Sequence, residues 1–317
     1  MASFTPPHVC LPDTAPDDPR IGHLLGRKLT SQANPQVVII GFPADEGVRR
    51  NGGRTGAALG PDAIRQSFYQ MTPLPEQNNS FYERLEYTRD LGNLETSGNV
   101  EDDQEILAEA LAPFLSQHVL SIVLGGGHET AYGHFLGYVK AQKKISILNW
   151  DAHTDVRELK DGLAHSGSPF RQAILHPSQA CRSYHVAGLL PTSVAQSHLA
   201  FVTEHGGRYE WKESLSPERI KAMYTSYSTP VMASFDLDAV DQAFAPGVSA
   251  PAVNGLSPDL WLHAAYVAGT CPLVRSMDIV ELNPLFDRDQ QTARLAALTL
   301  WSFFKGLGER DSAHSSI

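Results

Sequence analysis

Acidic and imidazole side chains gather in short motifs whose spacing is typical of metal binding. Asp151, His153 and Asp155 stand at positions i, i+2 and i+4 within Asn149-Trp-Asp-Ala-His-Thr-Asp155. Side chains at this spacing share one face of an extended chain. Two carboxylates beside an imidazole, directly after an apolar run, are costly unless a cation binds them. The alternative interpretation of this motif alone is a polar loop with an aspartate that caps a helix.

Two further motifs carry the same kinds of residue. Ser234-Phe-Asp-Leu-Asp238 places Asp236 and Asp238 at i and i+2 after an uncharged run. Leu124-Gly-Gly-Gly-His-Glu129 lets the chain turn sharply before His128. Taken alone, it would be an ordinary strand–helix turn with an incidental histidine. It matches neither the dinucleotide fingerprint nor the phosphate-binding loop, which disfavours nucleotide binding.

Together the three motifs supply four aspartates and two histidines. Four ionised carboxylates packed together repel one another, whereas two divalent cations would neutralise all four formal charges. Oxygen and imidazole ligands without thiolate favour Mn²⁺ or Mg²⁺ over structural zinc. Two such ions about 3.5–4 Å apart can share a bridging hydroxide near neutral pH. The motifs therefore predict hydrolysis at an electrophilic carbon.

Apolar runs that alternate with helical patterns must position these motifs. We expect strands at 37–42, 87–91, 121–124, 145–150, 184–188, 209–211, 231–235 and 274–280. We expect helices near 21–28, from 60 onward, and at 102–117, 129–142, 193–204, 216–226, 257–269 and 288–307. This alternation predicts an α/β fold with a mainly parallel sheet and helices on both faces. Ligands bind beyond the carboxyl ends of such strands, where all three motifs lie.

Composition narrows the class of protein further. The chain has 317 residues, of which 42% are hydrophobic, and a net charge of −10, which disfavours nucleic-acid binding. No uncharged apolar run reaches roughly 18 residues, so we expect no membrane partner and no span. The N-terminus lacks the pattern of a secretory signal, and three widely separated cysteines favour a reducing, cytoplasmic location. We expect an irregular N-terminal arm over 1–35, a single domain over 36–308 and a polar tail over 309–317.

The three motifs resemble the metal motifs of the ureohydrolase family, which includes arginase, agmatinase and formimidoylglutamase. They read GGGHE at 125–129, DAHTD at 151–155 and SFDLDAVDQAFAPGVSAP at 234–251. The resemblance extends from the expected strand at 37–42 to the helix that ends near 307. It implies a three-layer α/β/α sandwich with a mainly parallel, roughly eight-stranded sheet (arginase-like), two Mn²⁺ per chain and a homo-oligomer.

The family pattern also implies roles for individual residues. One manganese ion would be held by His128, Asp151, Asp155 and Asp236, and the other by Asp151, His153, Asp236 and Asp238. Asp151 and Asp236 would therefore bridge the ions. Glu281 matches the glutamate that receives the cationic C–N group of the substrate, and a carboxylate binds such a planar cation through paired hydrogen bonds. The alternative for Glu281 is a buried structural ion pair.

Departures from the usual motifs favour one branch of the family. Gly127 and Glu129 replace the aspartate and serine of GGDHS, Gln242 replaces a proline, and APGVSAP replaces the commoner APGTGTP. GGGHE and the segment 45–56 most resemble the formimidoylglutamase branch, which hydrolyses N-formimidoyl-L-glutamate to L-glutamate and formamide in histidine degradation. This small-molecule substrate carries two carboxylates. The alternatives are an arginase, agmatinase or other guanidino-acid hydrolase, or a catalytically silent paralogue that acts as a binding subunit.

Basic residues near the motifs fit a dianionic substrate. Arg157 stands where arginase-like chains usually have a neutral asparagine, and it suits a carboxylate through bidentate contacts. Arg49, Arg50 and Arg54 could add positive field from another loop. His165 lies roughly where the family's arginases and agmatinases keep a proton-shuttling histidine. For each of these residues the alternative is a solvated surface side chain.

Overall fold

The computed structural model describes residues 2–14, 17–30, 33–75 and 79–310, so the predicted tail lies outside the described residues from 311 onward. Within them, the strands are β1 (Phe4–Thr5), β2 (Val37–Phe42), β3 (Thr88–Leu94), β4 (Leu120–Gly125), β5 (Ile145–Trp150), β6 (Cys181–Leu189), β7 (Arg208–Trp211), β8 (Val231–Asp236) and β9 (Val274–Val280). They form one sheet in the order β1-β3-β2-β4-β9-β8-β5-β6-β7. Only β1 pairs antiparallel in this part of the chain, so eight strands are parallel.

Helices connect the parallel strands. In the described residues the α-helices are α1 (Ile21–Leu24), α2 (Glu46–Asn51), α3 (Gly60–Tyr69), α4 (Asn79–Glu86), α5 (Val100–Ser116), α6 (Thr130–Lys140), α7 (Pro169–Leu175), α8 (Gln196–Glu204), α9 (Pro217–Thr225), α10 (Pro258–Thr270) and α11 (Gln291–Glu309). Short 3-10 helices are η1 (Ala57–Leu59), η2 (Lys212–Ser214), η3 (Leu237–Ala239) and η4 (Pro284–Phe286).

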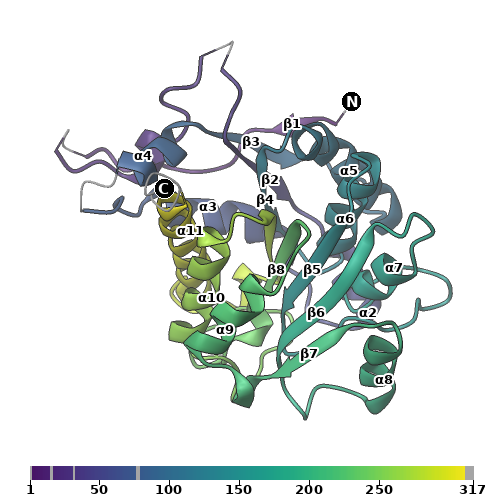
Figure 1. Cartoon of the computed structure of the whole chain (residues 1–317). Helices are drawn as coiled ribbons and strands as arrows, with labels where there is room; N and C mark the ends of the chain where they lie inside the picture. Colours follow the sequence, from purple (N-terminus) through teal and green to yellow (C-terminus); the bar gives the residue numbers. More distant parts are fainter. Residues whose placement is uncertain (1, 15–16, 31–32, 76–78, 311–317) are drawn as a thin grey trace.

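The sheet is the middle of three layers. Successive side chains of a strand point to opposite faces, and β2 shows the result. Val37 and Ile39 join one hydrophobic cluster, formed with α1, α3, α4, α9, α10 and α11. Ile40 and Phe42 join the other, formed with α5, α6, α7 and α8. Figure 1 shows α9, α10 and α11 on one side of the strands and α5, α6, α7 and α8 on the other. The predicted α/β/α sandwich with about eight parallel strands is confirmed.

The elements that the sequence did not predict are short. β1 has two residues and is defined by backbone pairing with β3, as Phe4 opposite Leu94. α2 and α7 have six and seven residues, too few for a helical periodicity to stand out. α4 was also missed. α1 ends at Leu24, earlier than the expected residue 28.

The centre of the sheet brings the chemical motifs together. β4, β9, β8 and β5 are consecutive neighbours in the sheet, and each ends directly before a motif residue or its loop. Their carboxyl ends therefore deliver His128, Glu281, Asp236 and Asp151 to one place. No helix among the described residues has both the length and the apolar character needed to cross a bilayer.

Candidate metal centre and substrate pocket

The structure brings together all six side chains that the sequence singled out as metal ligands. They form two groups that share Asp151, and within each group the ligand atoms lie within 4.8 Å of one another: His128, Asp151, Asp155 and Asp236, and Asp151, His153 and Asp238. All six are buried except His153, which is partly exposed. Asp236 belongs only to the first group in this geometry.

The contacts inside the cluster fit a cation better than direct pairing. His128 Nδ1 lies 2.9 Å from a carboxylate oxygen of Asp155 and 2.9 Å from one of Asp236. Yet this nitrogen, like Asp238 Oδ1, is buried without a hydrogen-bond partner among the described residues. Nitrogen and oxygen atoms that lie this close together without hydrogen-bond geometry are arranged as the ligands of one metal ion are. Oxygen and imidazole donors without thiolate suit Mn²⁺ or Mg²⁺, so this cluster can hold divalent metal.

The electrostatics of the cluster point the same way. Burial lowers the pKa of His128, but the close negative charges of Asp236 and Asp155 outweigh it and raise that pKa well above its usual range. Burial likewise lowers the pKa of His153, and Asp238 and Asp151 raise it overall. Burial and the neighbouring carboxylates raise the pKa of Asp236. The site therefore concentrates negative charge that protons or metal ions must compensate.

Glu281 lies beside the metal ligands, at the end of β9. The residue is 3% exposed, and its Oε1 accepts a hydrogen bond from the backbone N–H of His128 over 2.6 Å. Its Oε2 has no hydrogen-bond partner among the described residues. Burial raises the pKa of Glu281 to about 7. No cationic side chain pairs with it there, so the alternative of a structural ion pair is not supported.

One pocket connects these groups with Arg157. Its lining combines metal ligands, Glu281 and residues from α2 and two loops: Val48, Asn51, Gly53, His153, Asp155, Arg157, Ser166, Asp236, Asp238, Ser249, Ala250 and Glu281. Arg157 is exposed, and its Nη1 donates to Asn51 Oδ1 over 3.3 Å. The structure thus places an exposed arginine at the rim of the pocket that contains the metal cluster and Glu281.

His165 is placed differently from the sequence expectation. The residue is 4% exposed, so it is no surface side chain. Its Nδ1 accepts from the N–H of Gly167 over 3.1 Å, which makes Nε2 the donor to the carbonyl of Glu158 at 2.9 Å. Both ring nitrogens therefore hold the 157–168 loop together. This placement supports a role in loop structure and gives no direct support to proton transfer.

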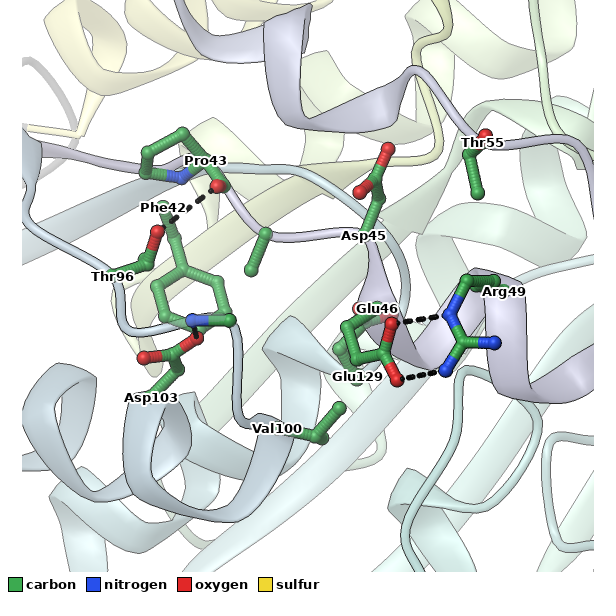
Figure 2. A pocket seen from close by; sticks show the side chains of 12 residues that line it. Phe42, Pro43, Asp45, Glu46, Arg49, Thr55, Thr96, Val100, Asp103 and Glu129 are labelled. Atoms are coloured by element: carbon green, nitrogen blue, oxygen red, sulfur yellow. Dashed lines mark hydrogen bonds and ion pairs between the residues drawn. The ribbon is translucent and has the colours of Figure 1, made fainter.

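The three arginines near α2 are occupied by other contacts. Arg49 binds Glu46 through Nε and Nη2, each at 2.6 Å, and lines a separate pocket with Asp45, Thr96 and Glu129, as Figure 2 shows. The remaining two are held elsewhere: Arg50 pairs with Glu46 and Glu101, and Arg54 bonds the carbonyl of Val248. Within the described residues, none of these three arginines lines the pocket of the metal cluster.

The unusual glycine motif has a packing explanation. A Cβ on Gly127 would lie 2.2 Å from Oε2 of Glu129. The Glu129 carboxylate therefore occupies the space that a side chain at position 127 would need. Its Oε1 accepts from the N–H of Gly47 over 2.8 Å, which ties the GGGHE turn to α2. The two departures from GGDHS thus depend on each other.

Comparison with known proteins gives the family. The model of the arginase family matches residues 35–305. The chain belongs to the arginase family. The formimidoylglutamase of Staphylococcus carnosus is 36% identical over 278 residues, which cover 84% of each chain. That of Nocardia farcinica is 37% identical over 270 residues, 82% of this chain and 83% of the relative.

Solved structures of arginase-family members agree. The crystal structure of Trypanosoma cruzi formiminoglutamase with Mn²⁺ has a TM-score of 0.83 and 29% identity, and covers 93% of this chain and 100% of that chain. The arginase of Bacillus subtilis, at 24% identity and a TM-score of 0.70, shares the fold. The predicted family and its formimidoylglutamase-like character are confirmed. This family member is a hydrolase that acts on C–N bonds of a small molecule.

Two supporting residues of this arginase-family site were overlooked in the sequence. Asn149 Nδ2 donates to Asp151 Oδ2 over 3.0 Å, and Ser234 Oγ lies 3.0 Å from His128 Nε2. Each stands two positions before an aspartate ligand, in a motif already noted. Residues at i and i+2 share one face of a strand, so the spacing alone could have identified both.

Proposed function

We propose that this protein is a binuclear manganese hydrolase that cleaves N-formimidoyl-L-glutamate to L-glutamate and formamide. One observation carries the proposal: a single pocket is lined by metal-ligand candidates, by the buried carboxylate of Glu281 and by Arg157. A carboxylate that can bind a cation and a guanidinium that can bind an anion thus line the same pocket. Formimidoylglutamate has a cationic head and two carboxylates. The similarity to formimidoylglutamases supports the same substrate.

The six clustered residues would hold the metal. His128, Asp155, Asp151 and Asp236 would bind one Mn²⁺, and Asp151, His153 and Asp238 the other. The family pattern would add Asp236 to the second set. When bound, the two ions supply an activated water for attack on the formimidoyl carbon. Asn149 orients Asp151, and Ser234 orients His128, by the contacts given above.

Glu281 would receive the cationic head. Its Oε1 accepts from the backbone N–H of His128, while its buried Oε2 finds no hydrogen-bond partner in the part of the chain that the structure describes. A formimidoyl N–H would donate to Oε2, and the positive charge of the head favours the ionised carboxylate. Glu281 would thereby hold the reacting carbon beside the metal cluster.

Arg157 would receive a carboxylate of the glutamate part. It lies at the rim of the pocket, and among the described residues its side chain donates only to Asn51, at 3.3 Å, which leaves most of its five N–H donors for a ligand. The chain extends from the head at Glu281 toward this rim. Substrates without a carboxylate, such as agmatine, would leave Arg157 unused.

Hydrolysis adds water across the C–N bond, so the departing glutamate nitrogen takes up a proton. His165 remains our candidate for this step, although it would first have to give up the Nε2–H bond to the carbonyl of Glu158. His165 would then deliver the proton from the loop that also carries Arg157.

A side-by-side product assay tests the proposal. Manganese-loaded protein is given formimidoylglutamate, arginine, agmatine and guanidinobutyrate at equal concentrations, and formamide and urea are quantified. We expect the highest kcat/KM with formimidoylglutamate. A preference for arginine or agmatine would contradict the substrate assignment and leave the metal chemistry intact. A protein without bound manganese and without turnover would be a silent paralogue.

A further inference from the structure

A chain of buried polar side chains runs from the metal cluster into the protein, and the chemistry proposed above uses only its first two members, His128 and Ser234. It comprises His128, Ser234, Asp278, His134, Ser276 and Tyr138, none more than 2% exposed. Asp278 Oδ2 lies 2.7 Å from His134 Nδ1, and Ser276 Oγ lies 2.6 Å from both His134 Nε2 and the Tyr138 hydroxyl. At the other end, Ser234 bonds Asp278 Oδ1.

The fold places these residues on one face of the sheet. His134 and Tyr138 are four positions apart on α6 and so share a helix face. Ser276 and Asp278 are two positions apart on β9. Ser234 of β8 is the direct neighbour of Asp278 in the sheet register. A polar row thus crosses the otherwise apolar contact between α6 and the central strands.

The direction of each hydrogen bond follows from Asp278. The Ser234 hydroxyl donates its single hydrogen to Asp278 Oδ1. Ser234 Oγ then accepts from His128 Nε2–H over 3.0 Å. When the ring is neutral, as metal binding requires, Nδ1 is the nitrogen without a hydrogen, and it faces Asp155 and Asp236. Asp278 therefore fixes, through one hydroxyl, which nitrogen of His128 can bind metal.

The other half of the row also ends on Asp278. Burial raises the pKa of Tyr138, so its hydroxyl remains a donor, to Ser276 Oγ. Ser276 then donates to His134 Nε2, and His134 Nδ1–H donates to Asp278 Oδ2. Every donor in the row has an acceptor in this arrangement. Without His134, one oxygen of a fully buried carboxylate would lose its partner, which is costly.

We propose, relying on the manganese site proposed above, that His134 is a positioning residue for one of the two metal ions. By holding Asp278, it orients Ser234 and hence the His128 ring. His128 belongs only to the first group of ligands. The second group, with His153 and Asp238, has no hydrogen bond to this row within the described residues. His134 therefore orients a ligand of one proposed ion and no ligand that belongs only to the other.

Manganese binding to the full-length protein tests this inequality. Titration calorimetry and the bound Mn²⁺ per chain are compared for wild type, His134→Leu and Tyr138→Phe. We expect His134→Leu to weaken the binding of one Mn²⁺ ion by about 10–100-fold and to leave the affinity for the other nearly unchanged. The electron paramagnetic resonance spectrum should then change from that of a coupled pair to that of an isolated Mn²⁺.

Tyr138→Phe is the matched control. It removes a buried hydroxyl from the same row but leaves the pairing of His134 with Asp278 intact. It should lower thermal stability and keep both ions. His134→Asn, which retains a short donor, should recover part of the lost affinity. If His134→Leu does not fold, Ser234→Ala interrupts the same relay by removing one oxygen, and the same ion should be lost.

The outcomes separate the two proposals. Two ions bound with wild-type affinity in His134→Leu or Ser234→Ala would overturn the positioning role. So would an equal loss of manganese in Tyr138→Phe, because the effect would then be general destabilisation. Wild-type protein that binds no Mn²⁺ would instead overturn the metal site, and the positioning role with it.

Discussion

The backbone N–H of His128 donates to Oε1 of Glu281 over 2.6 Å, and the N–H of Glu281 donates to the carbonyl of Gly126 over 2.8 Å. These two bonds join the turn after β4 to the end of β9. They also hold Glu281 at φ 68°, a left-handed conformation that is uncommon outside glycine. A metal-ligand candidate and the proposed acceptor of the substrate's cation are therefore fixed relative to each other, and the second carboxylate oxygen would receive the substrate.

Glu281→Gln tests that free oxygen. The amide keeps an acceptor for the His128 N–H but loses the charge that binds the formimidoyl group. Losing a charge-assisted contact costs on the order of 1.5–3 kcal/mol, so kcat/KM should fall roughly 10- to 150-fold. Manganese content should be unchanged.

Glu129→Gln is the matched control for Glu281. Burial raises the pKa of Glu129 to about 8, so this side chain is largely neutral at pH 7 and an amide resembles it. Steady-state kinetics of both variants are compared at pH 7. Equal losses in kcat/KM in the two variants would show that any change in this region lowers activity, and that the charge of Glu281 has no specific role in substrate binding.

Asp236→Asn should remove most of the stabilisation that manganese gives the protein. Burial and the neighbouring aspartates raise the pKa of Asp236, so at neutral pH, above its unfolded pKa, its ionisation opposes folding. The metal-free variant should therefore melt no lower than metal-free wild type. Wild type should gain about 2.7 kcal/mol with Mn²⁺ at a hundred times its Kd, whereas the variant should gain little and be inactive.

Thermal melts with and without Mn²⁺ measure this difference. Asp259→Asn is the control, because Asp259 is an exposed aspartate in the first turn of α10 and should leave metal stabilisation intact. A variant at Asp236 that is stabilised by Mn²⁺ as strongly as wild type would rule out its role as a ligand.

Manganese binding should release protons. In metal-free protein, the carboxylates hold the pKa values of His128 and His153 well above the usual range, despite burial. Both imidazoles are then protonated at pH 7 and must lose a proton to bind metal. Apparent affinity should therefore rise with pH, and calorimetry in buffers of different ionisation enthalpy should count released protons. Binding without proton release at pH 7 would contradict this charge state.

The parts of the site that the sequence predicts are those with local spacing. Asp151, His153 and Asp155 share one motif, and the bounds of β2 and β5 match the predicted apolar runs because buried parallel strands are largely hydrophobic. The predicted bounds of β9 also agree, although this strand contains polar residues. The ion pair of Arg50 could not be predicted in this way. Its partner Glu101 is 51 positions away, and only the fold brings the two together.

Loop residues illustrate the same limit. The ring of His165 is held by backbone atoms of Glu158 and Gly167, and backbone groups carry no sequence identity that a motif could reveal. The polar row from Ser234 to Tyr138 joins three elements, β8, β9 and α6. Its members are single polar residues in apolar runs, and only the register of β8 and β9 shows that they meet.

His165→Ala separates a proton donor from a loop support. If His165 delivers the proton, kcat should fall more than KM rises, with a changed pH profile. If its two backbone bonds only hold the 157–168 loop, KM should rise and the pH profile of kcat should stay as in wild type. His165→Asn, which can retain one of the two backbone bonds, should then restore KM but not a lost proton-transfer step.

Arg157 should determine the choice of substrate. Formimidoylglutamate is net anionic, whereas agmatine is wholly cationic, and in the proposed binding mode Glu281 and the metal ligands would hold the cationic head deep in the pocket. A carboxylate at the rim would then meet the guanidinium of Arg157. Arg157→Ala should weaken substrate binding by on the order of 1.5–3 kcal/mol, seen as a higher KM for formimidoylglutamate, with manganese content unchanged.

Discrimination against mono-carboxylate guanidino substrates should narrow in the same variant. Arg49→Ala is the matched control, because Arg49 is another exposed arginine near α2 but is paired with Glu46 and lines the other pocket (Figure 2). Its removal changes the net charge equally and should leave KM as in wild type. Equal rises in KM for the two variants would mean that general positive charge attracts the substrate, and that Arg157 makes no specific contact with its carboxylate.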